Sequence, residues 1–175
     1  MLLRHLLSVV LLPFVVVVIV PRVLLARDAV DGIVTSNSVI ALGRLAGPIV
    51  FAIGLALFTW CALLFARVGR GTLAPWDPTR RLVIVGPYRH VRNPMITAVC
   101  TMLAGEMLFF HSVRIGEWLL LFAAINHAYF VLLEEPGLHA RFGEEFERYR
   151  ANVPRWLPRR TGWPRSGVRR GSGTS

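Results

Sequence analysis

Apolar side chains are gathered along this chain into four long stretches that are separated by polar segments. A helix needs roughly 20 apolar residues to cross the hydrocarbon of a bilayer, and each stretch comes close to that length. The last two stretches are separated by only a few residues, so we expect an antiparallel helical hairpin there. The candidate spans cover about residues 6–25, 46–66, 95–110 and 115–133. The pattern therefore predicts an all-α integral membrane protein with about four transmembrane helices.

A further periodic segment follows the last apolar stretch. Apolar residues recur there at steps of three and four from Leu138 to Val153, and charged residues fill most of the other positions. This periodicity predicts an amphipathic cytoplasmic helix that lies on the membrane or on the protein's own surface. Pro154 is expected to end that helix. From Arg159 the chain has little to bury, so we predict a disordered basic tail over residues 159–175.

Small residues and cysteines inside the apolar stretches indicate packing. Thr97, Thr101 and Gly105 recur every four residues, the spacing that lets membrane helices approach one another closely. Cys61 and Cys100 each lie within an apolar stretch, as buried free thiols usually do. We therefore predict neither a disulfide nor a metal site.

The composition indicates which partners the chain has. It is 54% hydrophobic and 17% charged, which is too apolar for a soluble domain of this size. Its net charge is +10, but the basic residues flank apolar stretches instead of forming one soluble basic face. We therefore exclude nucleic acid and expect anionic lipid headgroups as partners. The basic residues are all Arg, which we attribute to a GC-rich genome and thus to a bacterial source.

The positions of the arginines also predict an orientation. Six Arg lie between the second and third stretches and nine follow the fourth. Short cytoplasmic segments of membrane proteins hold an excess of positive charge. Both segments should then face the cytoplasm, together with both termini, in a bacterial inner membrane.

Polar residues gather where the third apolar stretch begins. Asn93 followed by Pro94 indicates a helix start, because Asn can cap free backbone N–H groups and Pro suits the first helical position. A helix N-terminus also attracts anions, and Arg92 beside it would strengthen that attraction. Asn93 could equally serve as a cap alone, and Arg92 could be an ordinary cytoplasmic anchor.

Two adjacent carboxylates, Glu134 and Glu135, stand where the fourth apolar stretch ends. Charge at this depth is costly without a partner, so we expect cations or a cationic ligand nearby. His127 is seven residues before Glu134, which places both on one face of a regular α-helix. His127 could be a base or a helix-packing hydrogen bonder. Glu106, nearer the outer end, is expected to extend outward to the interface.

Three segments of the sequence together resemble one enzyme family. They are the run from Gly86 to Met95, the Glu134-Glu135 pair, and the segment from Phe142 to Pro158. In order and spacing they are similar to the isoprenylcysteine carboxyl methyltransferases, whose superfamily includes phospholipid N-methyltransferases. The resemblance covers roughly residues 69–158. It implies N-terminal transmembrane helices in residues 1–66 and a methyltransferase-like region with two further transmembrane helices in residues 67–158.

The resemblance implies an S-adenosylmethionine-dependent methyltransferase that acts on a lipid-soluble substrate, an isoprenoid carboxylate or a lipid headgroup. Arg92 would hold an anionic group of acceptor or cofactor, and Glu134 or Glu135 would bind the cofactor's amino or ribose groups. Asn93 stands where the family usually has His, and Ile96 where Tyr is common, so a role that requires that imidazole or phenol is not carried over to this chain. The implied catalytic residues are Arg92 and Glu135, and the implied cofactor-binding residues are Gly86, Pro87, Tyr88, Arg92, Asn93, Pro94, His127, Glu134 and Glu135.

Two other functions are compatible with this sequence. Membrane reductases of the sterol-reductase type look similar in their C-terminal helices but bind a nicotinamide cofactor. A non-catalytic membrane protein with the same fold is the other alternative, supported by the substitutions at Asn93 and Ile96. Binding of S-adenosylmethionine, of reduced nicotinamide nucleotide, or of neither would distinguish the three.

Overall fold

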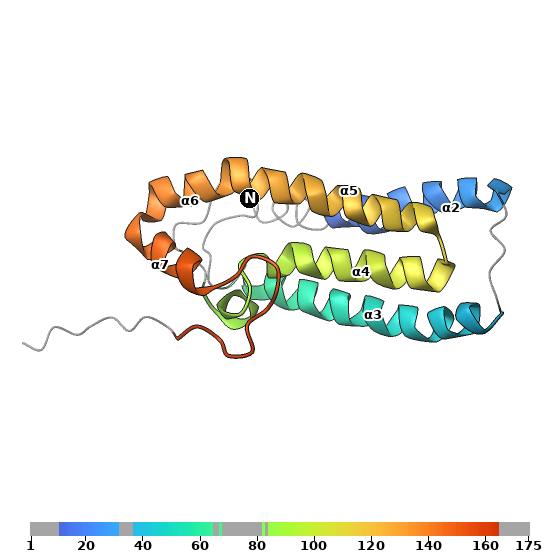
Figure 1. Ribbon diagram of the computed structural model, residues 1–175, viewed down its shortest axis with the longest axis horizontal. Coiled ribbons are helices and arrows are strands. Elements are labelled where there is room, and N and C mark those ends of the chain that lie inside the picture. Colours follow the sequence, from blue (N-terminus) through green and yellow to red (C-terminus); the bar gives the residue numbers. More distant parts are fainter. Residues whose placement is uncertain (1–10, 32–36, 65–66, 68–81, 83, 165–175) are drawn as a thin grey trace, which may run out of the picture.

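The computed structural model describes residues 11–31, 37–64, 67, 82 and 84–164, and these contain helices and no strand. Figure 1 shows an elongated bundle in which α3, α4 and α5 lie lengthwise, with α6 and α7 at one end. The elements are η1 (Val15–Ile19), α2 (Val20–Asp31), α3 (Asn37–Leu64), η3 (Gly86–Arg89), α4 (Pro94–Phe110), α5 (Val113–Tyr129), η4 (Phe130–Glu134), α6 (Glu135–Phe142) and α7 (Glu144–Asn152). The predicted all-α architecture is confirmed in the described residues.

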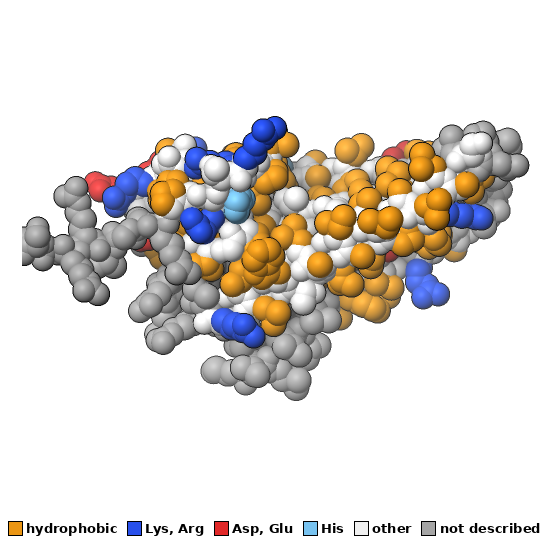
Figure 2. Space-filling model, turned by 90° about the horizontal axis from the view of Figure 1, so that it is seen from below, with side chains coloured by type: hydrophobic (Ala, Val, Ile, Leu, Met, Phe, Trp, Pro, Cys, Tyr) orange, Lys and Arg blue, Asp and Glu red, His pale blue; other side chains and the backbone are white. Residues whose placement is uncertain are grey.

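Two helical segments are long and apolar enough to cross a membrane, Ile40–Leu64 with 25 residues and Val113–Phe142 with 30. α4 is apolar but has only 17 residues, which extend about 26 Å against a hydrocarbon thickness of roughly 30 Å. The first predicted span begins outside the described residues. On the face shown in Figure 2, hydrophobic side chains cover the middle of the bundle and basic side chains lie toward its ends. Membrane spanning is thus supported for two helices, and the count of four stays a prediction.

α3 and α4 run antiparallel with their backbones in close contact. A Cβ atom added at Gly47 would lie 2.7 Å from the carbonyl oxygen of Gly105, and one added at Gly105 would lie 2.6 Å from the backbone nitrogen of Phe51. Gly43 and Gly54 continue this seam toward the two ends of α4. Glycine is required here because any side chain would push the helices apart. The small-residue packing predicted for Gly105 is confirmed, and its partner is α3.

The predicted hairpin between α4 and α5 is also confirmed. His111 ends α4 with a positive φ of 54°, and the Ser112 hydroxyl oxygen accepts a hydrogen bond from the backbone N–H of Ile115 at 3.2 Å. The tight turn therefore reverses the chain and caps the next helix at the same time.

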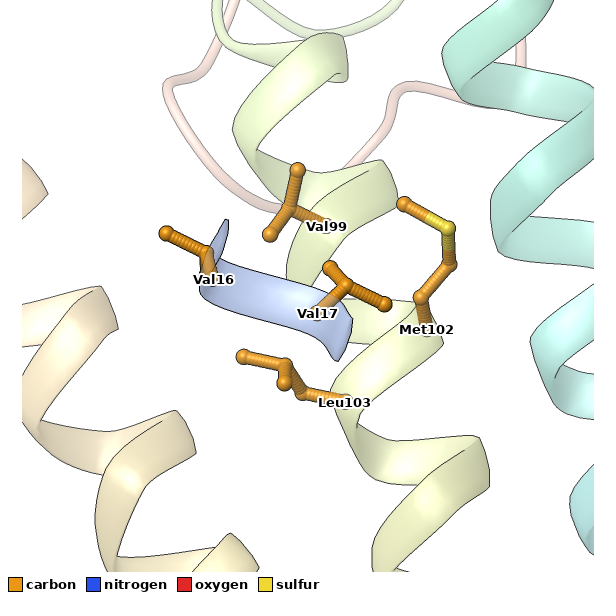
Figure 3. Packing of buried hydrophobic residues seen from close by; sticks show 5 residues of the cluster. All are labelled: Val16, Val17, Val99, Met102 and Leu103. Atoms are coloured by element: carbon orange, nitrogen blue, oxygen red, sulfur yellow. The ribbon is translucent and has the colours of Figure 1, made fainter. Parts of the chain in front are cut away.

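The N-terminal element η1 packs against α4. Val16 and Val17 of η1 pack against Val99, Met102 and Leu103 of α4, as Figure 3 shows. The indole N–H of Trp118 in α5 donates a hydrogen bond to the carbonyl oxygen of Val16 at 3.0 Å. These contacts hold η1 against α4 and α5.

The structure corrects two sequence-based predictions about helix ends. The helix that starts at Val113 does not end at Glu134-Glu135 but continues through Pro136 to Phe142. The π-helical turn η4 precedes Pro136. In it the backbone N–H of Glu135 donates a hydrogen bond to the carbonyl oxygen of Phe130, five residues earlier. This wider hydrogen-bond spacing accommodates a proline at the start of α6. The predicted single amphipathic helix is wrong as well, because Gly143, with φ of 49°, divides it into α6 and α7.

The predicted disordered tail begins too early at Arg159. Residues 153–164, called the strap below, run alongside the loop before α4. The backbone N–H of Arg159 donates a hydrogen bond to the carbonyl oxygen of His90 at 3.0 Å. The backbone N–H of Trp163 donates one to the carbonyl oxygen of Arg89 at 2.8 Å. The Trp163 ring packs against Tyr149, with 5.9 Å between ring centroids. Trp163 thus supplies the apolar surface that the tail was expected to lack, and residues 165–175 lie outside the described residues.

Candidate active site

One buried carboxylate joins three parts of the chain at one end of the bundle. Glu135 Oε1 accepts hydrogen bonds from Arg92 Nη1 at 2.7 Å and from Arg155 Nη2 at 2.6 Å. Arg150 Nε lies 3.7 Å from the other oxygen, Oε2. The side chains of Glu135, Arg92 and Arg155 are 7%, 13% and 19% exposed, so water screens these charges weakly. The cluster ties the start of α4, the start of α6 and the strap together.

Arg92 is held by the strap as well as by Glu135. Its backbone N–H donates to the carbonyl of Pro154 and its Nε donates to that of Val153, both at 2.9 Å. Burial lowers the pKa of Arg92, while the Glu135 carboxylate acts in the opposite direction. A guanidinium stays protonated in proteins. Arg92 is therefore a fixed positive charge directly before α4.

The predicted helix start at Asn93 and Pro94 is confirmed, but the predicted side-chain cap is wrong. Asn93 occupies the N-cap position and Pro94 the first turn of α4, yet the Asn93 side chain makes no capping hydrogen bond. Asn93 is 3% exposed, and its Nδ2 has no hydrogen-bond partner within the described structure. Leaving a buried donor unpaired costs about 1–3 kcal/mol. Its Nδ2 is therefore an unpaired buried donor next to Arg92.

The loop before α4 forms one wall of the site. Gly86 has φ of 55° and starts the turn η3, which also contains Pro87 and Tyr88. The carbonyl of Tyr88 accepts a hydrogen bond from the Tyr149 hydroxyl at 2.6 Å. Burial raises the pKa of both tyrosines, so both are neutral at physiological pH. Tyr88, predicted as a cofactor ligand, is buried against Cys61 behind this loop, and its role as a ligand stays a prediction.

An open cavity of about 360 Å³ lies beside this wall. Its volume is within the range of roughly 300–1,000 Å³ that small-molecule sites occupy. The predicted site residues Gly86, Pro87 and Pro94 line it, whereas Arg92, Asn93, Glu134, Glu135 and His127 are not among its lining residues. The remaining walls come from Leu57 and Trp60 of α3, Thr97 of α4 and Pro158 of the strap.

A family comparison bears directly on this end of the molecule. The sequence matches the family model of the phospholipid methyltransferases over residues 42–145, which is more than half of the chain. The protein belongs to the phospholipid methyltransferase family. This family is part of the isoprenylcysteine and phospholipid methyltransferase group that the sequence resembles, so the general class of enzyme, a methyltransferase, is as predicted. Comparison with curated proteins gave no match, and no solved structure matches.

The matched residues of the phospholipid methyltransferase family run from α3 into α7 and include Arg92 and Glu135. The strap lies beyond the match, although it supplies Arg155 to the charged cluster and Pro158 to the cavity. Sequence reasoning missed the role of Arg155, and also those of Leu57 and Trp60 in α3. The position of Arg155 directly after Pro154 was visible in the sequence. Only the fold shows that its side chain reaches Glu135.

His127 and Glu134 are placed differently from the prediction. The turn η4 interrupts the regular α-helix on which their predicted shared face depended. His127 is exposed and stacks on Trp156, whose indole N–H donates to His127 Nδ1 at 3.1 Å. Glu134 is partly buried and is near enough to Tyr88 to influence its pKa. Glu134 therefore lies in the neighbourhood of Tyr88 without lining the cavity, whereas His127 anchors the strap through Trp156.

Glu106 lies away from these residues. It stands 12 positions after Pro94 in α4, which corresponds to about 18 Å along the helix axis. Its Oε2 is buried without a hydrogen-bond partner in the described part of the chain. Glu106 therefore does not belong to the group of residues gathered at the start of α4.

Proposed function

We propose that this protein transfers the methyl group of S-adenosylmethionine to a lipid-soluble acceptor at the start of α4. The observation that supports this most directly is the joint position of polar groups and an apolar cavity. Buried Asn93 and partly buried Arg92 precede Pro94, which lines the cavity, and buried Glu135 of α6 is hydrogen-bonded to Arg92. A methyltransferase with a lipid-soluble substrate needs both a polar donor site and an apolar acceptor site, and these must be adjacent.

The residues present fit the donor molecule. S-adenosylmethionine carries a carboxylate, an ammonium group, ribose hydroxyls and a sulfonium. The unpaired Asn93 amide and the free N–H groups of the first turn of α4 suit the carboxylate. Glu134 suits the ammonium or a ribose hydroxyl, because it is a partly buried carboxylate near Tyr88. The direct cofactor contacts predicted for Arg92 and Glu135 stay predictions.

The chain's own contribution to the reaction is chiefly positioning. When bound, S-adenosylmethionine supplies a methyl carbon that an acceptor atom attacks as the carbon–sulfur bond breaks and its electron pair stays on sulfur. Alignment of the two molecules can supply most of the acceleration of such a displacement. Glu135 acts here by holding Arg92 and Arg155 together, which fixes the start of α4 relative to the strap. An anionic acceptor would need no base, whereas a protonated amine would first have to lose a proton.

The proposed orientation places this end of the bundle in the cytoplasm of a bacterial cell, with the protein in the inner membrane. It is supported by the six Arg between the second and third apolar stretches and by the nine that follow the fourth. A single cysteine introduced at Ser166, in a variant without Cys61 and Cys100, should resist a membrane-impermeant thiol reagent applied to intact cells. Labelling from outside would contradict the orientation and leave the chemistry untouched.

The function is tested by incubating the purified protein with methyl-labelled S-adenosylmethionine and a total lipid extract of its host. We expect label in a lipid product, and we expect Glu134→Gln to weaken cofactor binding in a calorimetric titration. Binding of reduced nicotinamide nucleotide in place of S-adenosylmethionine would favour the reductase alternative. Binding of neither would favour a non-catalytic protein.

A further inference from the structure

The cavity beside the start of α4 is apolar on nearly all sides. Leu57 and Trp60 stand one turn apart on α3, which is one of the two helical segments able to cross a membrane. Pro87, Pro94 and Pro158 supply further apolar walls from three other segments. The cavity therefore lies at the last turns of a membrane-spanning helix, where a molecule dissolved in the bilayer could reach it.

Trp60 is fixed against the turn η3 although half of its surface is open. A Cβ atom added at Gly86 would lie 2.7 Å from Leu64 Cδ1 and 3.5 Å from Trp60 Cζ2, so the indole packs directly on the turn. Trp60 is nevertheless 54% exposed. An indole in this position presents one side to the cavity and leaves the remainder toward lipid, as interfacial tryptophans do.

The charge of the described lining is one-sided. Arg89 and His90 are its two basic residues, and it contains no Asp or Glu. Both are held by the strap, because Arg89 Nε donates to the carbonyl of Trp163 at 2.6 Å and His90 Nδ1 lies 2.8 Å from that of Arg159. A zwitterionic amine headgroup would find no carboxylate partner here, and burying an unpaired ammonium is costly.

We propose that this cavity holds the apolar group of the methyl acceptor and that Leu57 and Trp60 determine its shape. The inference rests on the proposed methyl transfer and names its substrate class. A volume of about 360 Å³ suits one ring or one slender chain better than the two chains of a phospholipid. The acceptor is then a single-chain or single-ring amphiphile whose reacting atom is neutral or anionic and lies toward Arg89.

The test uses two photoreactive lipids with the full-length protein in nanodiscs. One is palmitic acid with a diazirine in its chain, and the other is phosphatidylethanolamine with the same diazirine chain. After irradiation, mass spectrometry locates the crosslinks. We expect the fatty acid to label peptides containing Pro94, Thr97 and Pro158, and the phospholipid to label them at least tenfold less.

Two variants assign the label to the cavity. Leu57→Trp fills it and should lower fatty-acid labelling of these peptides about tenfold, whereas Leu55→Trp, a change on the same helix at a side chain that is 48% exposed, should leave it unchanged. Trp60→Ala enlarges the cavity and should raise labelling by a bulkier branched-chain analogue, which remains a test if Leu57→Trp does not fold. Equal labelling in all variants, or equal labelling by the phospholipid, would overturn the proposal.

S-adenosylmethionine affinity measured on the same preparations separates the two proposals. Leu57→Trp should change it less than twofold, because the proposed donor site lies at Asn93 and Glu134. If the parent protein binds the fatty acid in the cavity but does not bind S-adenosylmethionine, the proposed methyl transfer is wrong. The cavity is then a lipid-binding site and not an acceptor site. If it binds S-adenosylmethionine but no cavity crosslinks form, only the acceptor assignment fails.

Discussion

Glu135 accepts two hydrogen bonds from Arg155, at 2.9 Å from Nε and 2.6 Å from Nη2, and both fall on the same carboxylate oxygen. Arg92, the residue before the N-cap of α4, donates to that oxygen too. A single buried carboxylate therefore adds charged hydrogen bonds to the backbone bonds that hold the strap against the start of α4. Several properties of the protein should depend on this contact.

The first prediction concerns folding stability. Glu135→Gln leaves Arg92 and Arg155 without their shared anion, and breaking a buried ion pair in this way costs about 3–5 kcal/mol. We expect a clear fall in the unfolding temperature measured in detergent. Glu147→Gln is the matched control, because Glu147 is half exposed and its contacts to His139 and Arg150 are at the surface. Equal unfolding temperatures for both variants would contradict the central role of Glu135.

A second prediction concerns cofactor affinity. Charge-assisted hydrogen bonds contribute roughly 1.5–3 kcal/mol each, so Arg92→Ala and Glu135→Gln should each lower S-adenosylmethionine affinity about ten- to a hundredfold. The effect follows either from lost contacts or from a displaced start of α4. Glu106→Gln, far along the helix, should change it little. Calorimetric titration decides, and the reverse order of effects would mean that the site lies at the other end of the bundle.

Truncation of the chain should separate the strap from the residues beyond it. A chain that ends after Pro164 keeps the backbone bonds of Arg159 and Trp163 to the loop before α4 and the contact between Trp163 and Tyr149. A chain that ends after Pro158 loses all of these. We expect the first chain to have the stability and the cofactor affinity of the parent. The second chain should be less stable and should bind the cofactor more weakly. Limited proteolysis and titration of both chains measure the difference, and equal behaviour would show that residues 159–164 of the strap are dispensable.

The seam between α3 and α4 should not tolerate side chains. Gly105→Ala places a methyl group 2.6 Å from the backbone nitrogen of Phe51, which cannot move without its whole helix. Such overpacking typically costs about 1–3 kcal/mol, so the variant should give less folded protein on size-exclusion chromatography. Gly137→Ala in α6 has nothing within 4 Å of the new atom and should be neutral or slightly stabilising. A Gly105→Ala variant as stable as Gly137→Ala would argue against this packing.

Alkaline pH should weaken the protein through its buried tyrosines. Burial raises the pKa of Tyr149 above the ordinary value, which is about 10, and it raises that of Tyr88 as well. Because the folded-state pKa is the higher one, this stability is fully present below about pH 10 and is lost as the pH rises further. Tyr149→Phe removes the bond to the Tyr88 carbonyl and should cost about 1 kcal/mol at neutral pH.

Chemical or thermal unfolding of both proteins between about pH 8 and pH 11 measures this effect. The parent should lose more stability across that interval than Tyr149→Phe, which has one titrating tyrosine fewer. Tyr88 remains in the variant, so some loss should persist. An identical pH profile for the two proteins would show that Tyr149 is not buried as described.

The sequence by itself determined the features that follow from local pattern and chemistry. Long apolar stretches predict helices regardless of their neighbours, so α4 and the hairpin at His111 could be predicted within a residue or two. Proline is favoured at the first position of a helix, so Pro94 predicted where α4 starts. The order of the motifs around Arg92 and Glu135 was enough to indicate the enzyme group. Gly43 and Gly47, four residues apart, were an available packing signal that was not used.

Tertiary structure decided what depends on partners distant in the chain. Whether Pro136 ends a helix depends on the register of the preceding turn, which a periodic pattern does not contain. In the sequence Trp163 lies within a polar tail, and only the fold shows that its ring packs against Tyr149. Arg155 and Arg92 are 63 positions apart, yet they share one oxygen of Glu135, because the strap folds back across the loop before α4. Local sequence fixes where helices form, since their hydrogen bonds are local, but a buried charge selects its partners only once burial has removed the competing water.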